Sequence, residues 1–188
     1  MAVKQAQTKK YDRVRLLTYT AVLAALTFAL TMVHIAPAAN AGYSHLGDAV
    51  IYLSASILPW PYAMLSASVG GALADLVSGS ANWAIATIII KALNVVPFAL
   101  VRLWLEKRGR DRKIFSVWSV PALLLSGLVT FFGYLLAEMI VYGTPFAMLA
   151  SVSTGWIQPV FSTVVFVVLA LALDRADFKK KIQISFKK

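Results

Sequence analysis

The chain has 188 residues, of which 60% are apolar and only 14% charged, too few charges to cover a water-soluble domain of this length. A net charge of +10 would suit nucleic-acid binding, but the 18 lysines and arginines are concentrated in short stretches between long apolar runs. The absence of cysteine excludes disulfides and thiolate metal sites, and the two histidines lack metal-ligand spacing, so we expect no metal site. This composition indicates an integral membrane protein.

Long apolar runs, each long enough to cross a bilayer as a helix, follow one another along the whole chain. The first run follows a basic stretch and precedes the small residues 36–41, as in a signal peptide, but it is too long for one, so we expect this helix to be retained. We predict an all-α fold, one membrane domain over residues 1–188, with six transmembrane helices near 14–34, 43–59, 61–78, 82–105, 117–142 and 151–173.

Two predicted helices carry rows of small residues spaced four apart, which place small side chains on one helix face. In the first helix the row consists of Ala21, Ala25 and Ala29. In the third it consists of Ser66, Gly70 and Ala74, and we expect this row to pack inside the bundle. The spacing alone does not tell whether the first row faces the bundle or a separate protein.

Residues Pro59, Trp60 and Pro61 interrupt an apolar stretch that would otherwise form one kinked helix. We interpret them as a tight turn, because six spans bring all the basic stretches to one side of the membrane. Five spans would put the segment 107–113 opposite the amino terminus, against the positive-inside rule. The basic stretches lie before residue 16, at 107–113 and after residue 174. The rule thus predicts a multi-pass protein of the cell membrane with both termini cytoplasmic.

Charged residues inside a membrane cost at least about 2.5 kcal/mol each, so each needs a partner, water or a function. Asp48, Asp75, Lys91 and Glu138 all fall in the half of the membrane away from the basic stretches, whereas Arg102 is near the basic side and can snorkel. One ammonium cannot neutralise three carboxylates, which favours an outward-facing polar cavity. The alternative is that Lys91 pairs with Asp75 only to join the third and fourth helices.

Further polar and aromatic residues fall near the same cavity. Asn94 lies one turn beyond Lys91, and Gln158 precedes a proline near the outer side of the sixth helix. Trp83 and Tyr142 are candidates for stacking on a ring, although an aromatic belt at the membrane surface would also explain them. The predicted substrate-binding residues are Glu138, Lys91, Asn94, Trp83, Tyr142, His45, Asp48 and Gln158.

Three ordered motifs resemble the substrate-binding S components of energy-coupling factor (ECF) vitamin transporters, in their riboflavin-type and hydroxymethylpyrimidine-type group. They are Gly-Tyr-Ser-His-Leu-Gly-Asp-Ala-Val at 42–50, Gly-Ala-Leu-Ala-Asp-Leu at 71–76 and Thr-Ile-Ile-Ile-Lys-Ala at 87–92. The sequence departs from this group at Ala92, where glycine is expected. The resemblance covers most of the chain and implies six helices, cytoplasmic termini and an extracellular-side pocket built from helices four to six and the outer loops.

The resemblance also implies how the protein works with partners. Ala21, Ala25 and Ala29 match the motif through which S components dock on a transmembrane coupling subunit, which acts with two ATP-binding subunits. The chain has no phosphate-binding Gly-x-x-x-x-Gly-Lys-Ser/Thr motif, so ATP is used by the partners and we expect no cofactor on this chain. The acids and rings favour hydroxymethylpyrimidine or pyridoxine, with riboflavin or another vitamin as the alternative.

Two other functions also fit a small membrane protein. A stand-alone proton-coupled carrier would use Asp48 or Glu138 as a relay, but such carriers usually contain an inverted repeat, which this sequence does not display. An intramembrane serine protease would use Ser80 with a histidine, but no Gly-x-Ser-x-Gly elbow is present and neither histidine is suitably spaced. We therefore expect no enzyme activity.

Overall fold

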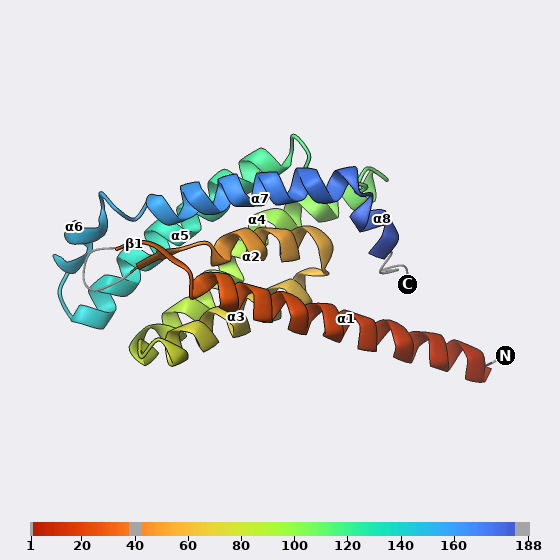
Figure 1. Ribbon diagram of the computed structural model, residues 1–188, viewed down its shortest axis with the longest axis horizontal. Coiled ribbons are helices and arrows are strands. Elements are labelled where there is room, and N and C mark those ends of the chain that lie inside the picture. The colour runs from red at the N-terminus through yellow and green to blue at the C-terminus, as the bar shows by residue number, and fades with distance from the viewer. Residues whose placement is uncertain (1, 38–42, 183–188) are drawn as a thin grey trace.

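The computed structural model describes residues 2–37 and 43–182, and most of these residues are helical (Figure 1). The longer helices are α1 (Ala2–Thr31), α3 (Trp60–Val77), α4 (Ala84–Lys107), α5 (Ser119–Tyr142) and α7 (Ile157–Arg175). The shorter ones are α2 (Gly47–Ile57), the 3-10 helix η1 (Ala81–Trp83), α6 (Ala147–Ser151) and α8 (Phe178–Ile182). Within the described ranges, four segments are long and apolar enough to cross a membrane: Arg13–Thr31, Ala81–Lys107, Ser119–Tyr142 and Ile157–Arg175. The protein is thus a helical membrane protein, as predicted.

The short helix α2 lies at the centre of the bundle. All of its eleven residues are buried, and it contacts α1, α3, α4 and α7 (Figure 1). A helix with apolar residues on every side is stable only when other helices cover it. The four neighbouring helices provide that cover, which explains the central position of α2. At about 1.5 Å per residue, it is roughly half as long as the hydrocarbon core is thick. The predicted span 43–59 is therefore a shorter helix than expected, because strand and turn occupy its ends.

The break predicted at Pro59 is confirmed. Helix α2 ends at Ile57, Leu58 and Pro59 are extended, and α3 begins at Trp60 with Pro61 in its first turn. Proline fits there because the first turn of a helix needs no backbone donor. The chain reverses at this point, so α2 and α3 run in opposite directions (Figure 1).

Two short strands at the end of α1 were not predicted. Strand β1 (His34–Pro37) pairs antiparallel with β2 (Tyr43–His45), with His34 opposite His45 and an irregularity between His34 and Ala36. Residues 38–42, which include Gly42 of the first motif and part of the small-residue segment, lie outside the described residues. The strand pair fixes where the chain enters α2. It therefore also fixes the position of Asp48, which lies in the first turn of that helix.

The last long helix starts later than predicted. Helix α6 ends at Ser151, residues 152–156 form turns, and α7 begins at Ile157 instead of at residue 151. Pro159 stands in the first turn of α7, where its missing N–H removes no helical hydrogen bond. The pair Gln158 and Pro159 thus begins a helix instead of interrupting one.

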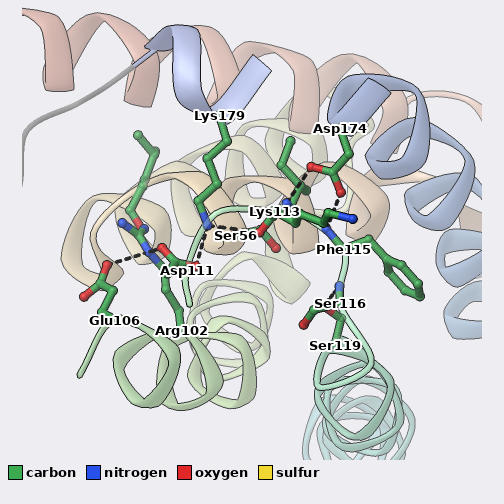
Figure 2. A network of polar contacts seen from close by, with 12 residues as sticks. Ser56, Arg102, Glu106, Asp111, Lys113, Phe115, Ser116, Ser119, Asp174 and Lys179 are labelled. Carbon is green, nitrogen blue, oxygen red and sulfur yellow. Dashed lines mark hydrogen bonds and ion pairs between the residues drawn. The ribbon is translucent and has the colours of Figure 1, made fainter. Parts of the chain in front are cut away.

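A network of charges joins several elements at the end of the bundle that carries the basic stretches, here called the basic end (Figure 2). Arg102 donates a hydrogen bond to the Leu58 carbonyl, and its Nε lies 3.0 Å from Glu106 and 3.4 Å from Asp111. The expectation that Arg102 snorkels is therefore wrong, since its side chain is 7% exposed and holds the α2–α3 turn against α4. A buried arginine with these partners needs no water.

The same network fastens the carboxy-terminal helices to the loop between α4 and α5 (Figure 2). Lys179 of α8 lies 2.6 Å from Asp111, and burial lowers the pKa of Lys179 while the Asp111 carboxylate opposes that shift. Asp174 of α7 accepts hydrogen bonds from the backbone amides of Ile114 and Phe115, at 2.7 and 3.0 Å. The loop is thus held by α4, α7 and α8 together.

The two rows of small residues differ in their surroundings. Ser66, Gly70 and Ala74 are buried, which confirms that the α3 row packs inside the bundle. Gly70 meets α1 closely, since a Cβ at this position would lie 2.6 Å from the Ala24 carbonyl oxygen and from Thr27 Cβ. The α1 row, Ala21, Ala25 and Ala29, is exposed, because α1 presents its other face to α3.

We predict that Gly70→Ala destabilises the protein by about 1–3 kcal/mol, because the added methyl group forces α1 and α3 apart. Unfolding in detergent measures the change. Val69→Ala is the matched control, since the neighbouring Val69 side chain is 40% exposed and its truncation leaves the interface intact. Equal stability of the two variants would contradict this account of the α1–α3 contact.

Candidate binding site

A fully buried ion pair lies where α2 and α4 meet. Lys91 Nζ of α4 is 2.6 Å from Asp48 Oδ1 of α2, and both side chains are at most 1% exposed. The alternative pairing of Lys91 with Asp75 is therefore wrong, although Asp75 is close enough to interact electrostatically with Lys91. Asp48 is the second residue of α2, where the helix dipole favours a carboxylate. Two buried charges are stable only when hydrogen bonds satisfy their remaining atoms.

Two further helices supply those hydrogen bonds to Asp48. Its Oδ2 accepts from the Thr130 hydroxyl of α5 at 3.1 Å and from Gln158 Nε2 of α7 at 2.9 Å. With Lys91 on Oδ1, the carboxylate has three donors from three helices. Four helices therefore converge on one carboxylate, and the predicted residues Asp48, Lys91 and Gln158 are brought together.

Asn94 joins this group, and the hydrogen-bond directions fix how its amide is turned. A carboxylate only accepts, so the Thr130 hydroxyl must give its hydrogen to Asp48. The Thr130 oxygen then accepts from Asn94 Nδ2, at 2.8 Å. Asn94 Oδ1 is consequently an acceptor, and it is buried with no hydrogen-bond partner among the described residues. A buried carbonyl oxygen without a donor is costly.

The predicted aromatic residues lie beside the ion pair and connect to it through Tyr134. The Trp83 ring centroid is 6.1 Å from that of Tyr142 and 6.2 Å from that of Tyr134. Lys91 Nζ lies 5.0 Å from the Tyr134 ring centroid, within the range of a cation–π contact. Trp156, which precedes α7, stacks on Phe131 with ring centroids 3.9 Å apart.

The two remaining predicted residues lie at the edges of this group. His45 is buried, its Nδ1 accepts the Gly47 backbone N–H at 3.1 Å, and its carbonyl accepts from Ser162 at 3.3 Å. His45 thus holds the backbone at the first residue of α2. Glu138 is buried and accepts a hydrogen bond from the Ser151 hydroxyl of α6 at 2.5 Å, so it links α5 to the short helix α6.

Several polar residues of this region were missed. Thr130 and Tyr134 contact the ion pair, and Ser126 donates to the Asn94 carbonyl at 2.8 Å. A signal for them exists in the sequence, because Ser126, Thr130, Tyr134 and Glu138 recur every four residues of α5. This spacing places all four on one face of a helix, as a polar row in an otherwise apolar segment.

We predict that Asp48→Asn destabilises the protein by about 3–5 kcal/mol, because it leaves the Lys91 ammonium buried without a counter-charge. Lys91→Met should also destabilise it. The double variant should lose less than the sum of the two by about 1–3 kcal/mol, as expected for directly interacting groups. Unfolding in detergent tests this, with Asp177→Asn at the exposed basic end as the control. Strictly additive effects would contradict the ion pair.

The geometry of the polar group does not identify a protein family, but comparison with known proteins does. The sequence model of the family described as ECF-type riboflavin transporter, S component, matches residues 12–175, which include the greater part of α1, the other long helices and the whole polar group. No curated protein matches the sequence significantly. The family's members bind substrate for a transporter and are not enzymes. Because the match covers most of its length, this chain belongs to the family of ECF-type riboflavin transporter S components.

Proposed function

We propose that this protein captures a small water-soluble vitamin or vitamin precursor for an ECF-type importer, with hydroxymethylpyrimidine or pyridoxine as the favoured substrates. The observation that carries the proposal is the buried polar group on α2, α4, α5 and α7, with the unsatisfied oxygen of Asn94. Asp48 already has three donors, so Asn94 is the better acceptor for a ligand's hydroxyl or N–H group. Hydroxymethyl and amino groups on a small ring supply such donors.

The aromatic residues support a flat ligand. The Trp83 ring lies 6.2 Å from Tyr134 and 6.1 Å from Tyr142, and Lys91 Nζ lies 5.0 Å from the Tyr134 ring. A planar heterocycle can lie against these rings with its donor toward Asn94. Riboflavin is the second candidate, because the family that matches the chain is named for it. Its three-ring system would need a longer stacking surface than a single-ring vitamin does.

In this proposal the basic end faces the cytoplasm, and α2 and α3 complete a six-span topology. The positive-inside rule supports that orientation, and the basic stretches near α8 and the α4–α5 loop gather at one end through Asp111 and Asp174. Lys91 is the eighth residue of α4, so it lies roughly 12 Å from the opposite end of that helix. The site is thus in the outer half of the membrane, where a vitamin arrives.

The chain would deliver its substrate with an ATP-driven module made of a transmembrane coupling subunit and two ATP-binding subunits. The exposed row Ala21, Ala25 and Ala29 supports docking, because small side chains on a face free of α3 allow another helix to approach closely. The lack of a phosphate-binding motif in the sequence supports the need for partners.

A vitamin panel tests the substrate. We expect the purified protein to bind hydroxymethylpyrimidine or pyridoxine, and Asn94→Leu to weaken binding about tenfold or more by removing the acceptor. Ser126→Ala is the matched control, because the Ser126 hydroxyl donates to the Asn94 backbone carbonyl and not to the Asn94 side chain. Tight binding of riboflavin alone would replace the small-ring substrates with riboflavin. Binding of no vitamin would contradict the proposed function.

A second test separates docking from substrate binding. Ala25→Phe should reduce uptake by the reconstituted complex to background while substrate binding by the isolated chain is unchanged, because the bulky ring blocks the flat face of α1. Leu124→Phe is the control, since Leu124 is 67% exposed on α5, away from this face. Normal uptake by Ala25→Phe would count against this docking face, and transport by the chain alone would indicate a self-contained carrier.

A further inference from the structure

A second buried polar group lies beside the first, on the side of α3. Asp75 of α3 is 8% exposed, and its Oδ2 has no hydrogen-bond partner in the described part of the chain. Its other interactions are with the Thr87 hydroxyl and, electrostatically, with Lys91. The Thr87 hydroxyl is also 3.3 Å from the Tyr134 hydroxyl. Asp75 is thus a buried carboxylate whose hydrogen bonding is incomplete.

Close packing of α3 on α4 brings Asp75 to the ion pair. Gly71, one turn before Asp75, lies against α4 so closely that a Cβ there would be 2.8 Å from Thr87 Cγ2 and 3.2 Å from Lys91 Cγ. Residues 71 and 75 share one face of α3, as Thr87 and Lys91 share one face of α4. The Asp75 carboxylate therefore shares the environment of Lys91 and Tyr134, although Lys91 itself is paired with Asp48.

The charges in this region do not balance. Asp48 and Asp75 are two carboxylates, and Lys91 is the single ammonium between them. His45 lies on the Asp48 side with Nδ1 used as an acceptor, and Glu138, one turn beyond Tyr134, adds another acid. Arg102 is eleven residues further along α4 and is engaged at the basic end. A buried carboxylate without a counter-charge is unfavourable, and a cation entering the site would offset it.

We propose that Asp75 is a specificity-determining residue that selects a flat nitrogen heterocycle carrying a positive charge when bound. This inference rests on the proposed function and names the chemical class of its substrate. The ring lies against Tyr134 and Trp83, whose π faces favour a cation, with its donor on Asn94 and its charge toward Asp75. The charge is either fixed or carried by a protonated ring nitrogen.

Two probes that differ in charge and in one N-methyl group test the proposal. They are 4-amino-5-hydroxymethyl-2-methylpyrimidine, which is neutral above pH 8, and its N1-methylated cation, with riboflavin as a neutral three-ring probe. Equilibrium binding to the purified full chain gives the ratio of the two affinities. We expect the cation to bind about tenfold more tightly than the neutral ring. A difference of this size is typical of one interaction with a charged group.

Asp75→Asn keeps the side-chain volume and removes the charge, so it should abolish this preference, whereas Asp75→Glu should retain part of it. Asp177→Asn, which removes an exposed carboxylate at the basic end, should leave the ratio unchanged. No preference in the parent protein, or equal loss for both probes in Asp75→Asn, would overturn the inference while leaving the proposed function intact. Binding of none of the three probes would overturn both.

Discussion

The arrangement of this protein depends on keeping two opposite charges together in a place without water. Asp48 and Lys91 are both fully buried, and separating either from the other would leave an uncompensated charge in the interior. The remaining hydrogen bonds of Asp48 come from Thr130 on α5 and Gln158 on α7, so the pair is stable only when four helices are in place. The ion pair therefore determines the relative positions of these helices as much as their apolar packing does.

The central position of α2 follows from the same constraint. Helix α2 is short and buried on all sides, and its first turn carries Asp48 into the middle of the bundle. The strand pair and the close approach at Gly47, where a Cβ would lie 2.1 Å from Thr31 Oγ1, leave little freedom in that entry. The backbone at the start of α2 thus restricts where the Asp48 side chain lies. Such pre-arranged polar groups lower the cost of binding a small ligand.

Much of the fold could be predicted from the sequence, because apolar run length, proline position and basic-residue distribution act over whole segments. The break at Pro59 follows from such signals, and polar residues inside apolar runs indicated Asp48, Lys91, Asn94 and Gln158, which the structure brings together. The partner of Lys91 could not be predicted, since Asp48 and Asp75 lie at similar depths and only the rotation of α2 and α3 distinguishes them. The strands and the burial of Arg102 depend on contacts between distant segments, which sequence spacing does not contain.

The charge network at the basic end has a mechanical consequence for the interior. Asp174 and Lys179 tie the carboxy-terminal helices to the loop that follows α4, and Arg102 ties α4 to the turn that ends α2. Helix α4 is continuous from this network to Lys91, and α2 is continuous from the turn to Asp48. Two continuous helices therefore connect the network around Asp111 to both members of the ion pair, so the two distant polar groups are held along the same pair of helices.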